Sequence, residues 1–250
     1  MARRGQKKHL KRLPAPAHWP IKRKLDKFTT RAIPGPHGKQ EGLPLTLLLR
    51  EELGIAENMR EVKVILSAGN VFVDGRARKD PRFMVGLMDV VEIKPSGDRF
   101  RLLPKRQGGL RVVPITEAEA KFKLGRIQRK MMAPGGRCQM TLHDGRNLLL
   151  PTKAKPTDYS PLDTLVISIP EQELLESIRL EKGAYAVVTQ GRNVGMEGKI
   201  LEIEKRVGTH ASTVTVQDPD GNKFQTALEY VFVLGKDKSK VSLDTAGGTA

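Results

Sequence analysis

The stretch LLLREELGIAENMREVKVILSAGNVFVDGRARKDPRFMVGLMDVVEI, residues 47–93, decides the fold of the first part of the chain. Two helices are predicted at its start, because apolar residues recur at helical spacing in two sets. The first set is Leu45, Leu48, Leu49 and Leu53, and the second is Met59, Val62, Ile65 and Leu66. Gly54 and Gly69 follow these sets and predict where the helices end.

The second half of the stretch predicts strands. VFVDGRARK is typical of a strand that enters a tight turn at Asp74-Gly75, and a further strand is predicted over residues 90–93. The turn is rich in cations, which are Arg76, Arg78, Lys79 and Arg82. Together with Arg60 and Lys63 of the second helix they predict a basic groove suited to RNA phosphates. A small domain with a solvated basic turn is the alternative that these charges leave open.

Upstream of this domain the chain is strongly basic. Residues 1–39 hold twelve Lys or Arg and one acid, Asp26, in a chain of 250 residues whose net charge is +16. The cations chosen as candidate RNA contacts are Arg3, Arg4, Lys7, Lys8, Lys11, Arg12, Lys22, Arg23, Lys24, Arg31 and Lys39. Prolines and glycines punctuate residues 1–42, so an irregular arm that becomes ordered on a polyanionic partner is predicted.

The arm also contains the single tryptophan of the chain. His18 and Trp19 stand next to each other and offer a flat face on which an RNA base or an arginine could stack. The alternative is that Trp19 anchors the arm to the globular body or to a neighbouring protein. The sequence leaves both readings open.

From residue 95 onward the pattern is that of short strands separated by Gly, Pro and Asp, which favours small barrels. Hairpins are predicted with turns at Asp144-Gly145 and Asp220-Gly221, and TEAEAKFKLGRI (116–127) predicts a short helix or helical turn. The stretch KGAYAVVTQGRNVGMEGKILEIEKR, residues 182–206, predicts a tightly turned hairpin. Its loop residues Arg192 and Asn193 are further candidates for RNA contact, with a solvated loop as the alternative.

Two of these stretches resemble known modules. Residues 47–93 resemble the RNA-binding domain shared by a small-subunit ribosomal protein, some pseudouridine synthases and tyrosyl-tRNA synthetases, through the positions Gly69, Val71, Val73, Asp74, Gly75 and Asp89. The chain departs from that pattern at residues 86–89, where the family has Gly and Asp adjacent. Residues 182–206 resemble the KOW motif through Gly183, Val187, Val188, Gly191, Gly195, Gly198 and Ile200.

The order of these parts resembles the archaeal and eukaryotic small-subunit ribosomal protein "four-e" family. The resemblance implies an α+β multi-domain protein with five segments: a basic N-terminal arm extended on RNA (1–42), an α+β RNA-binding domain (43–94), a β-rich central domain (95–174), an SH3-like KOW barrel (175–235) and a C-terminal tail (236–250), which looks frayed. It also implies a structural constituent of the cytoplasmic small ribosomal subunit. The implied partners are ribosomal RNA and neighbouring ribosomal proteins, with early binding during assembly.

Other classes of protein fit the sequence poorly. A single cysteine, Cys138, allows neither a disulfide framework nor a Cys-rich zinc site, and we interpret it as a buried or incidental thiol. No apolar run is long enough for a membrane span. Nucleotide-binding and hydrolase motifs are missing, and His143 is predicted to be an exposed loop residue. We therefore expect no catalytic residue, metal, cofactor or small-molecule substrate. An RNA-modifying enzyme, or a translation or transcription factor using the same domain, is the alternative.

Overall fold

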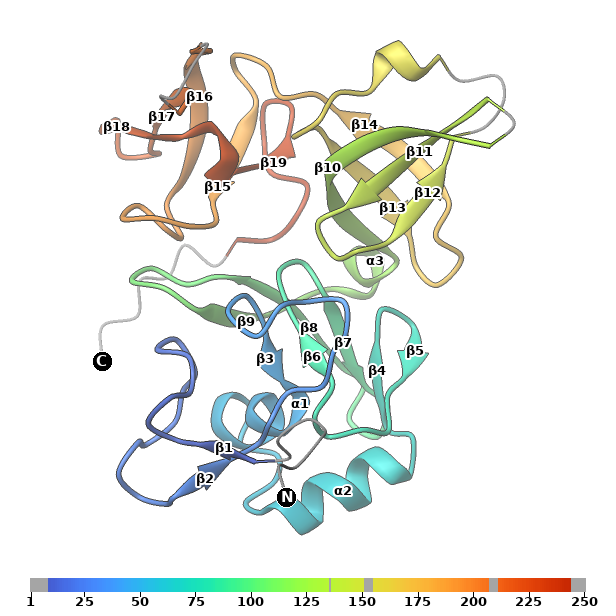
Figure 1. The fold of residues 1–250 in the computed structure, drawn as a ribbon, viewed down its shortest axis with the longest axis vertical. Helices are drawn as coiled ribbons and strands as arrows, with labels where there is room; N and C mark the ends of the chain where they lie inside the picture. The colour runs from blue at the N-terminus through green and yellow to red at the C-terminus, as the bar shows by residue number, and fades with distance from the viewer. Residues whose placement is uncertain (1–8, 135, 151–154, 207–210, 244–250) are drawn as a thin grey trace, which may run out of the picture.

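The computed structural model describes residues 9–134, 136–150, 155–206 and 211–243. Three five-stranded antiparallel sheets dominate it, and helices are few and short. Figure 1 shows the arm, the helices and the first sheet in the lower half of the molecule, with the other two sheets side by side above them. The predicted α+β class, with sheets in the majority, is confirmed.

The first sheet has the strand order β5-β4-β7-β8-β9. Its strands are β4 (Val71–Val73), β5 (Arg76–Ala77), β7 (Val90–Ile93), β8 (Asp98–Pro104) and β9 (Leu110–Pro114). The helical elements beside it are α1 (Leu45–Leu47), the π-helical turn η1 (Leu48–Glu52) and α2 (Met59–Ser67), and the short strands β3 (Leu43–Pro44) and β6 (Met84–Val85) pair nearby.

Local sequence explains these elements. Asn58 caps α2, because its side chain accepts hydrogen bonds from the backbone N–H groups of Arg60 and Glu61. Val62 and Leu66 of α2 are fully buried, and this face packs on the sheet. Between β4 and β5, Asp74 and Gly75 both have positive φ values, 49° and 73°, as a type I′ hairpin turn requires. The predicted helices and the predicted tight turn are confirmed.

The first sheet continues beyond the boundary predicted at residue 94. Strands β8 and β9 pair in register with β7 and with each other, up to Pro114. The reason is local: a turn at residues 94–97, closed by Gly97 with φ 75°, folds β8 back onto β7 as a hairpin. Residues assigned to the central domain therefore complete the sheet of the first one.

The central sheet has the order β12-β11-β10-β13-β14. Helix α3 (Glu117–Ala120) leads into it, and its strands are β10 (Phe122–Ala133), β11 (Arg137–Leu142), β12 (Asn147–Leu149), β13 (Thr164–Ser168) and β14 (Leu174–Ile178), with the 3-10 turn η2 (Pro156–Asp158) between β12 and β13. The hairpin predicted around Asp144-Gly145 is the β11–β12 pair. Cys138 is buried in the core of this sheet, as predicted.

The last sheet has the order β18-β17-β16-β15-β19. Its elements are β15 (Tyr185–Val188), β16 (Glu197–Glu204), β17 (Thr213–Gln217), β18 (Lys223–Ala227), the 3-10 turn η3 (Leu228–Tyr230) and β19 (Val231–Gly235). The predicted hairpin over residues 182–206 is the β15–β16 pair. Residues 175–178, which were assigned to the KOW barrel, lie in β14 of the central sheet, because β14 pairs with β13.

The described part of the predicted frayed tail is mostly exposed over residues 236–240, but its end is docked on the body. Val241 is 3% exposed and belongs to an apolar cluster that includes Met88 of the first half and Phe232 of the last sheet. The Ser242 hydroxyl donates to Glu119 Oε1 at 2.5 Å, and Lys240 forms an ion pair with Glu176. The structure differs from the prediction because two apolar residues, Val241 and Leu243, dock the end of the segment on this cluster. The remainder of the predicted tail, residues 244–250, lies outside the described residues.

Candidate nucleic-acid interface

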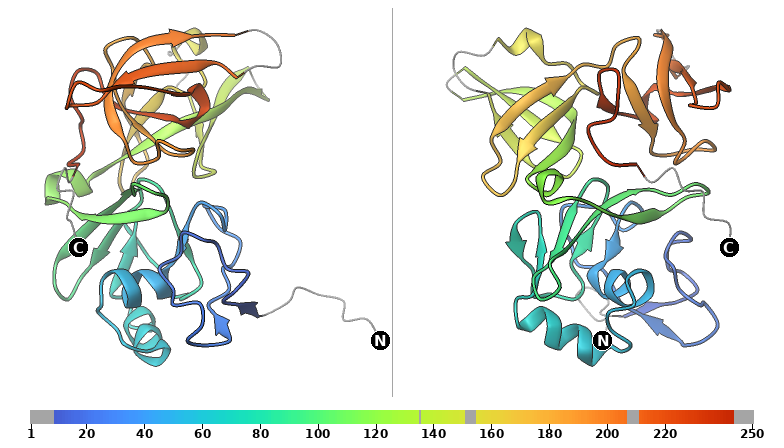
Figure 2. Two further views of the ribbon diagram at one scale, coloured as in Figure 1. Left: turned by 90° about the vertical axis from the view of Figure 1, so that its left-hand side faces the viewer. Right: turned by 180° about the vertical axis from the view of Figure 1, so that it is seen from behind.

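The described part of the arm is folded against the body. Short strands β1 (Leu10–Lys11) and β2 (Phe28–Thr29) pair as a ribbon, and both views of Figure 2 show the arm beside the helices of the lower half. The Arg12 guanidinium holds the ribbon: it donates to Phe28 O at 3.2 Å, Lys22 O at 2.8 Å and Asp26 Oδ2 at 2.7 Å. An extended arm is therefore not what residues 9–42 form, and Arg12, which is buried, is not free for a phosphate.

Arg23 has a similar internal role. Its guanidinium donates to four backbone carbonyls, those of Arg12, Leu13, Ala15 and Pro16, at 2.8–3.2 Å. A loop with few strand or helix partners leaves its carbonyls needing donors, and an arginine supplies several at once. The Arg23 guanidinium is thus engaged within the arm, and its predicted contact with RNA stays a prediction.

Trp19 anchors the arm to the body. Its side chain is 3% exposed and lies in the apolar cluster that contains Leu43 and Leu45, and its Nε1–H donates to Gly42 O at 2.9 Å. The indole therefore offers no face to an RNA base, and the anchoring alternative is the one observed. His18 is half-buried beside it, with Nε2 3.2 Å from Gly42 O.

Other cations of the arm remain at its surface. Lys11, Lys22, Lys24 and Lys39 are exposed, and Arg31 is half-buried. Four further predicted contacts, Arg3, Arg4, Lys7 and Lys8, lie outside the described residues. The folded arm thus keeps a basic exterior around an interior held by Arg12, Arg23 and Trp19.

The predicted RNA contacts of the first domain also differ in whether they contact other groups of the protein. Arg60 and Lys63 on α2 are exposed, and so are Arg76 and Lys79 near the β4–β5 turn. Arg82 is exposed as well and Arg78 is half-buried, and both also contact protein groups. The Arg78 guanidinium lies 4.3 Å from the Phe83 ring centroid, and Arg82 donates to both carboxylate oxygens of Asp80. The side-chain hydrogen bond from Arg82 lowers the pKa of Asp80.

The predicted loop residues lie between β15 and β16. Arg192 is exposed, whereas Asn193 is half-buried and its Nδ2 donates to Gln225 O at 3.1 Å. The backbone turns sharply here, because Gly191 and Gly195 both have positive φ values. Arg192 is therefore presented at the tip of a well-defined loop.

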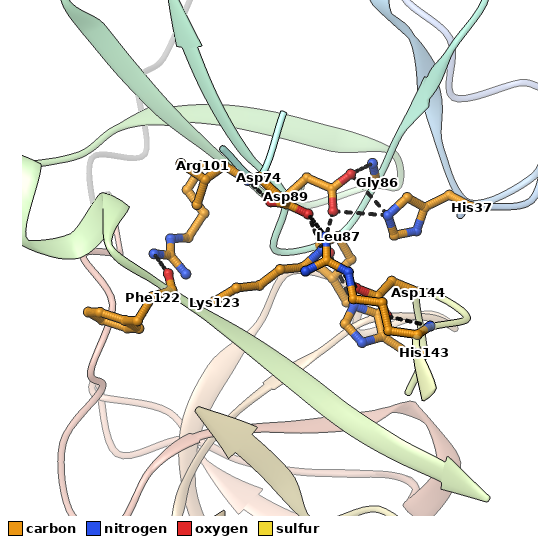
Figure 3. A network of polar contacts seen from close by, with 12 residues as sticks. His37, Asp74, Gly86, Leu87, Asp89, Arg101, Phe122, Lys123, His143 and Asp144 are labelled. Atoms are coloured by element: carbon orange, nitrogen blue, oxygen red, sulfur yellow. Dashed lines mark hydrogen bonds and ion pairs between the residues drawn. The ribbon is translucent and has the colours of Figure 1, made fainter. Parts of the chain in front are cut away.

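A buried polar network that the sequence analysis missed joins the arm, the first sheet and the central sheet (Figure 3). Lys123 of β10 is 1% exposed, and its ammonium nitrogen lies 2.8 Å from Asp74, 2.5 Å from Asp89 and 2.9 Å from Asp144. Arg146 pairs with Asp74 and Asp144. The network therefore balances three buried carboxylates with two cations.

Electrostatics fix the charge state of the network. Burial alone would lower the pKa of Lys123, but Asp89, Asp74 and Asp144 raise it above its ordinary value. Burial alone would raise the pKa of Asp89 and Asp144, but Lys123 holds both below their ordinary values. Depressed carboxyl pKa values stabilise the fold above about pH 4, and the raised lysine pKa does so below about pH 10, so the network is fully stabilising between these limits.

Two further arginines connect neighbouring sheets through hydrogen bonds. Arg101 of β8 is fully buried, and its guanidinium donates to Glu119 O at 2.7 Å and Phe122 O at 2.9 Å. Burial lowers its pKa to about 10. Arg126 of β10 donates to Glu229 O and Val231 O of the last sheet. The basic excess of the chain thus serves the junctions of the fold as well as its surface.

His143 lies at the same junction and not on an exposed loop as predicted. Its Nδ1 accepts a hydrogen bond from the Arg126 backbone N–H at 3.2 Å, and its Nε2 is 3.1 Å from Leu87 O, to which it donates. Its ring also meets the Phe232 ring edge-on at 5.3 Å. Burial, and next the charge of Lys123, lower the pKa of His143 from 6.5 to about 4.

We expect the folded state to lose about 2 kcal/mol of stability between pH 7 and pH 5, because the unfolded state gains a proton on His143 in this range and the folded state does not. Denaturant unfolding at both pH values measures the loss. His143→Gln, which keeps a donor and an acceptor, should remove most of it, and His9→Gln, at an exposed position, should retain it. An unchanged pH dependence in His143→Gln would contradict this assignment.

Within the described residues, no helix is long and apolar enough to cross a membrane. The same part of the chain contains no group of three or more His, Cys, Asp or Glu side chains placed to hold a metal ion.

The candidate interface consists of cations on the arm, on α2, near the β4–β5 turn and in the β15–β16 loop.

Comparison with known families accounts for most of the chain. Residues 4–40 match the RS4NT (NUC023) domain, residues 46–91 match the S4 domain, and residues 96–174 match the ribosomal family S4e. The S4 match agrees with the predicted RNA-binding domain in position.

Full-length relatives and a solved structure agree with these matches. The chain is 45% identical to the small ribosomal subunit protein eS4 of Staphylothermus marinus, over 97% of this chain and 98% of that protein. It is 44% identical to the protein of the same name from Methanocaldococcus jannaschii, over 97% of this chain and 100% of that protein. The crystal structure of the 30S ribosomal protein S4e from Thermoplasma acidophilum covers 78% of this chain and 96% of its own, with 32% identity and a TM-score of 0.64. The chain therefore belongs to the ribosomal protein family S4e.

Proposed function

We propose that this protein is a structural constituent of the small ribosomal subunit and that it binds ribosomal RNA there. The observation that carries the proposal is similarity over nearly the whole chain to proteins named small ribosomal subunit protein eS4. A role in the ribosome, a cytoplasmic particle, and RNA and ribosomal proteins as partners follow from that similarity. The relatives are ribosomal proteins and not enzymes, so the protein acts by binding.

The proposed RNA contacts are the exposed cations. They are Lys11, Lys22, Lys24 and Lys39 of the arm, Arg60 and Lys63 of α2, Arg76 and Lys79 near the β4–β5 turn, and Arg192 of the β15–β16 loop, with Arg31, His18 and Asn193 at partly buried positions beside them. Exposed cations bind phosphates by releasing condensed counterions, and they need no specific base. Arg78 and Arg82 have protein partners, so we propose that they contribute less to RNA binding than the cations named above.

We also propose that the last sheet is the SH3-like KOW barrel that the sequence resembles. Its support is a five-stranded antiparallel sheet whose β15–β16 loop turns at Gly191 and Gly195. Gly198 supports it as well, since a Cβ at this position would collide with the backbone of Gln217 on the adjacent strand. These glycines are among the positions through which residues 182–206 resemble the KOW motif.

The salt dependence of binding tests the proposal. The protein should bind a transcript of small-subunit ribosomal RNA, with log Kd rising steeply against log salt concentration. Removing residues 1–8, which hold Arg3, Arg4, Lys7 and Lys8, should reduce that slope by up to about 3, at 0.7–0.9 per phosphate contact.

Removal of residues 244–250, DTAGGTA, is the matched control, because it deletes a segment of similar length without any cation. The control should bind like the full chain. Absence of binding by the full chain would refute the RNA-binding function. An unchanged slope after removal of residues 1–8 would exclude those four cations from the interface.

A further inference from the structure

A groove of about 610 Å³ lies where three parts of the chain meet. One wall comes from the arm and the helical segment after it, the second from the β8–β9 hairpin tip, and the third from the β15–β16 loop. Figure 1 shows the green hairpin tip between the orange loop above it and the blue arm below it. The residues that line the groove include His18, Gln40, Glu52, Lys105, Arg106 and Gln190.

Two glycines hold the walls close together. A Cβ on Gly109 at the hairpin tip would lie 3.2 Å from His18 Cβ and His18 O. A Cβ on Gly195 of the loop would lie 2.6 Å from the backbone nitrogen of Arg106. The hairpin tip is thus packed against the arm on one side and against the loop on the other, so the shape of the groove is set by backbone contacts.

The groove has basic and polar residues along its lining. Lys105 and Arg106 are exposed at the hairpin tip, and Arg192 is exposed on the loop next to the lining residue Gly191. Gln40 and Gln190 are exposed residues of the lining, and their amides can both donate and accept hydrogen bonds. The acidic side chain of this lining, Glu52, is half-buried and can accept a hydrogen bond from an amino group of a base.

The groove also continues inward. Six of its lining residues, among them His18, Gln40 and Gln190, are shared with a smaller cavity of about 140 Å³. That cavity is lined further by His37, His143 and Arg126, beside the buried network of the junction. The junction side chains therefore line the cavity into which the groove continues.

We propose that this groove binds an unpaired stretch of RNA, with Lys105 and Arg106 on its phosphates and the exposed amides of its lining facing its bases. The inference rests on the proposed function and adds a site that the sequence analysis did not include. The volume of the groove is in the range of pockets that bind one small ligand. It therefore has room for one nucleotide of an RNA strand and for the nucleotides next to it, but not for an RNA duplex. The positive charge of Lys105 and Arg106 matches the charge of the phosphates.

The first test compares two double variants in binding to a small-subunit ribosomal RNA transcript. Lys105→Ala with Arg106→Ala should weaken binding roughly tenfold and lower the salt slope by about 1.4, which is two single-strand phosphate contacts. The control is Lys199→Ala with Lys223→Ala, because both lysines are exposed on the last sheet and neither lines the groove. The control should bind like the unaltered protein.

A second test locates the RNA. Gln190→Cys places a thiol at an exposed position of the groove, and the native Cys138 is buried and does not compete for the label. A tethered iron–EDTA group at residue 190 should cleave the bound RNA within an unpaired segment. The same label at Lys223→Cys should cleave elsewhere.

The outcomes separate the two proposals. If the unaltered protein fails to bind the transcript, the proposed function fails. If it binds, but the Lys105/Arg106 variant matches the control in affinity and slope, the groove proposal is refuted and the proposed function stands. Cleavage from residue 190 along both strands of a helix would also refute the groove proposal, because it would place a duplex there.

Discussion

Replacing Lys123 with methionine is expected to destabilise the protein by roughly 3–5 kcal/mol, because removing one partner leaves buried charge uncompensated. Methionine keeps much of the length of the side chain but loses the ammonium that contacts Asp74, Asp89 and Asp144. Arg146 would still pair with Asp74 and Asp144, and Asp89 would keep only its side-chain contact with His37. Urea unfolding followed through the fluorescence of Trp19, the only tryptophan, measures the change.

Lys121→Met is the matched control, since residue 121 is an exposed lysine two positions before Lys123. Its effect should stay within about 0.5 kcal/mol. A Lys123→Met protein as stable as this control would mean that the carboxylates find other compensation. The network would then not be what holds the first and central sheets in their relative positions.

Replacing Trp19 with alanine is expected to cost about 3–5 kcal/mol, the usual loss for a large buried aromatic side chain. The indole is 3% exposed, and its Nε1–H is the donor to Gly42 O. Since this side chain fixes the arm to the body, the variant should also be cleaved within the arm at low protease concentration. Unfolding of the variant is followed by circular dichroism.

Leu13→Ala is the control for Trp19→Ala, because Leu13 lies in the same arm and is 73% exposed. It should change stability and protease resistance little. Trp19→Phe should fall between the two, since it keeps most of the buried area and loses the hydrogen bond. If Trp19→Ala were as stable and as resistant as Leu13→Ala, the arm would not depend on this anchor.

The elements that the sequence predicts best are those set by local signals. The helical spacing of Val62 and Leu66 and the Asp74-Gly75 turn carry their information within a few residues, and the structure has the corresponding helix and turn. The end of the first domain depends on pairing between β7 and β8. Composition does not record that pairing, so the sequence did not show that the first sheet extends past residue 94.

The arm shows why charge alone was a poor guide to conformation. Residues 9–42 contain few apolar side chains, which predicts a segment unable to fold alone. The segment is nevertheless folded, because it makes contacts beyond its neighbours in sequence. Trp19 inserts into the core of the neighbouring domain, and Arg12 and Arg23 donate hydrogen bonds to loop carbonyls. A lysine or arginine that will donate inward has the same sequence signature as one that will face solvent.

The junction was missed for a related reason. Asp74 and Asp89 were identified as motif positions, but their partner Lys123 is 34 or more residues away and sits in a strand without any distinctive pattern. A charged residue among the inward-facing positions of β10, beside the fully buried Leu124 and Ile127, was the available signal. Pairing that signal with three distant carboxylates requires the fold.

The central claim is that this protein is an integral part of the small ribosomal subunit. The most direct measurement is sucrose-gradient sedimentation of a cell lysate in about 0.5 M salt, with each fraction probed for the protein, since high salt removes loosely bound polycations first. The account predicts that the protein stays with the small subunit at one copy per particle. Movement of the protein to the top of the gradient would contradict it and favour a transiently bound factor.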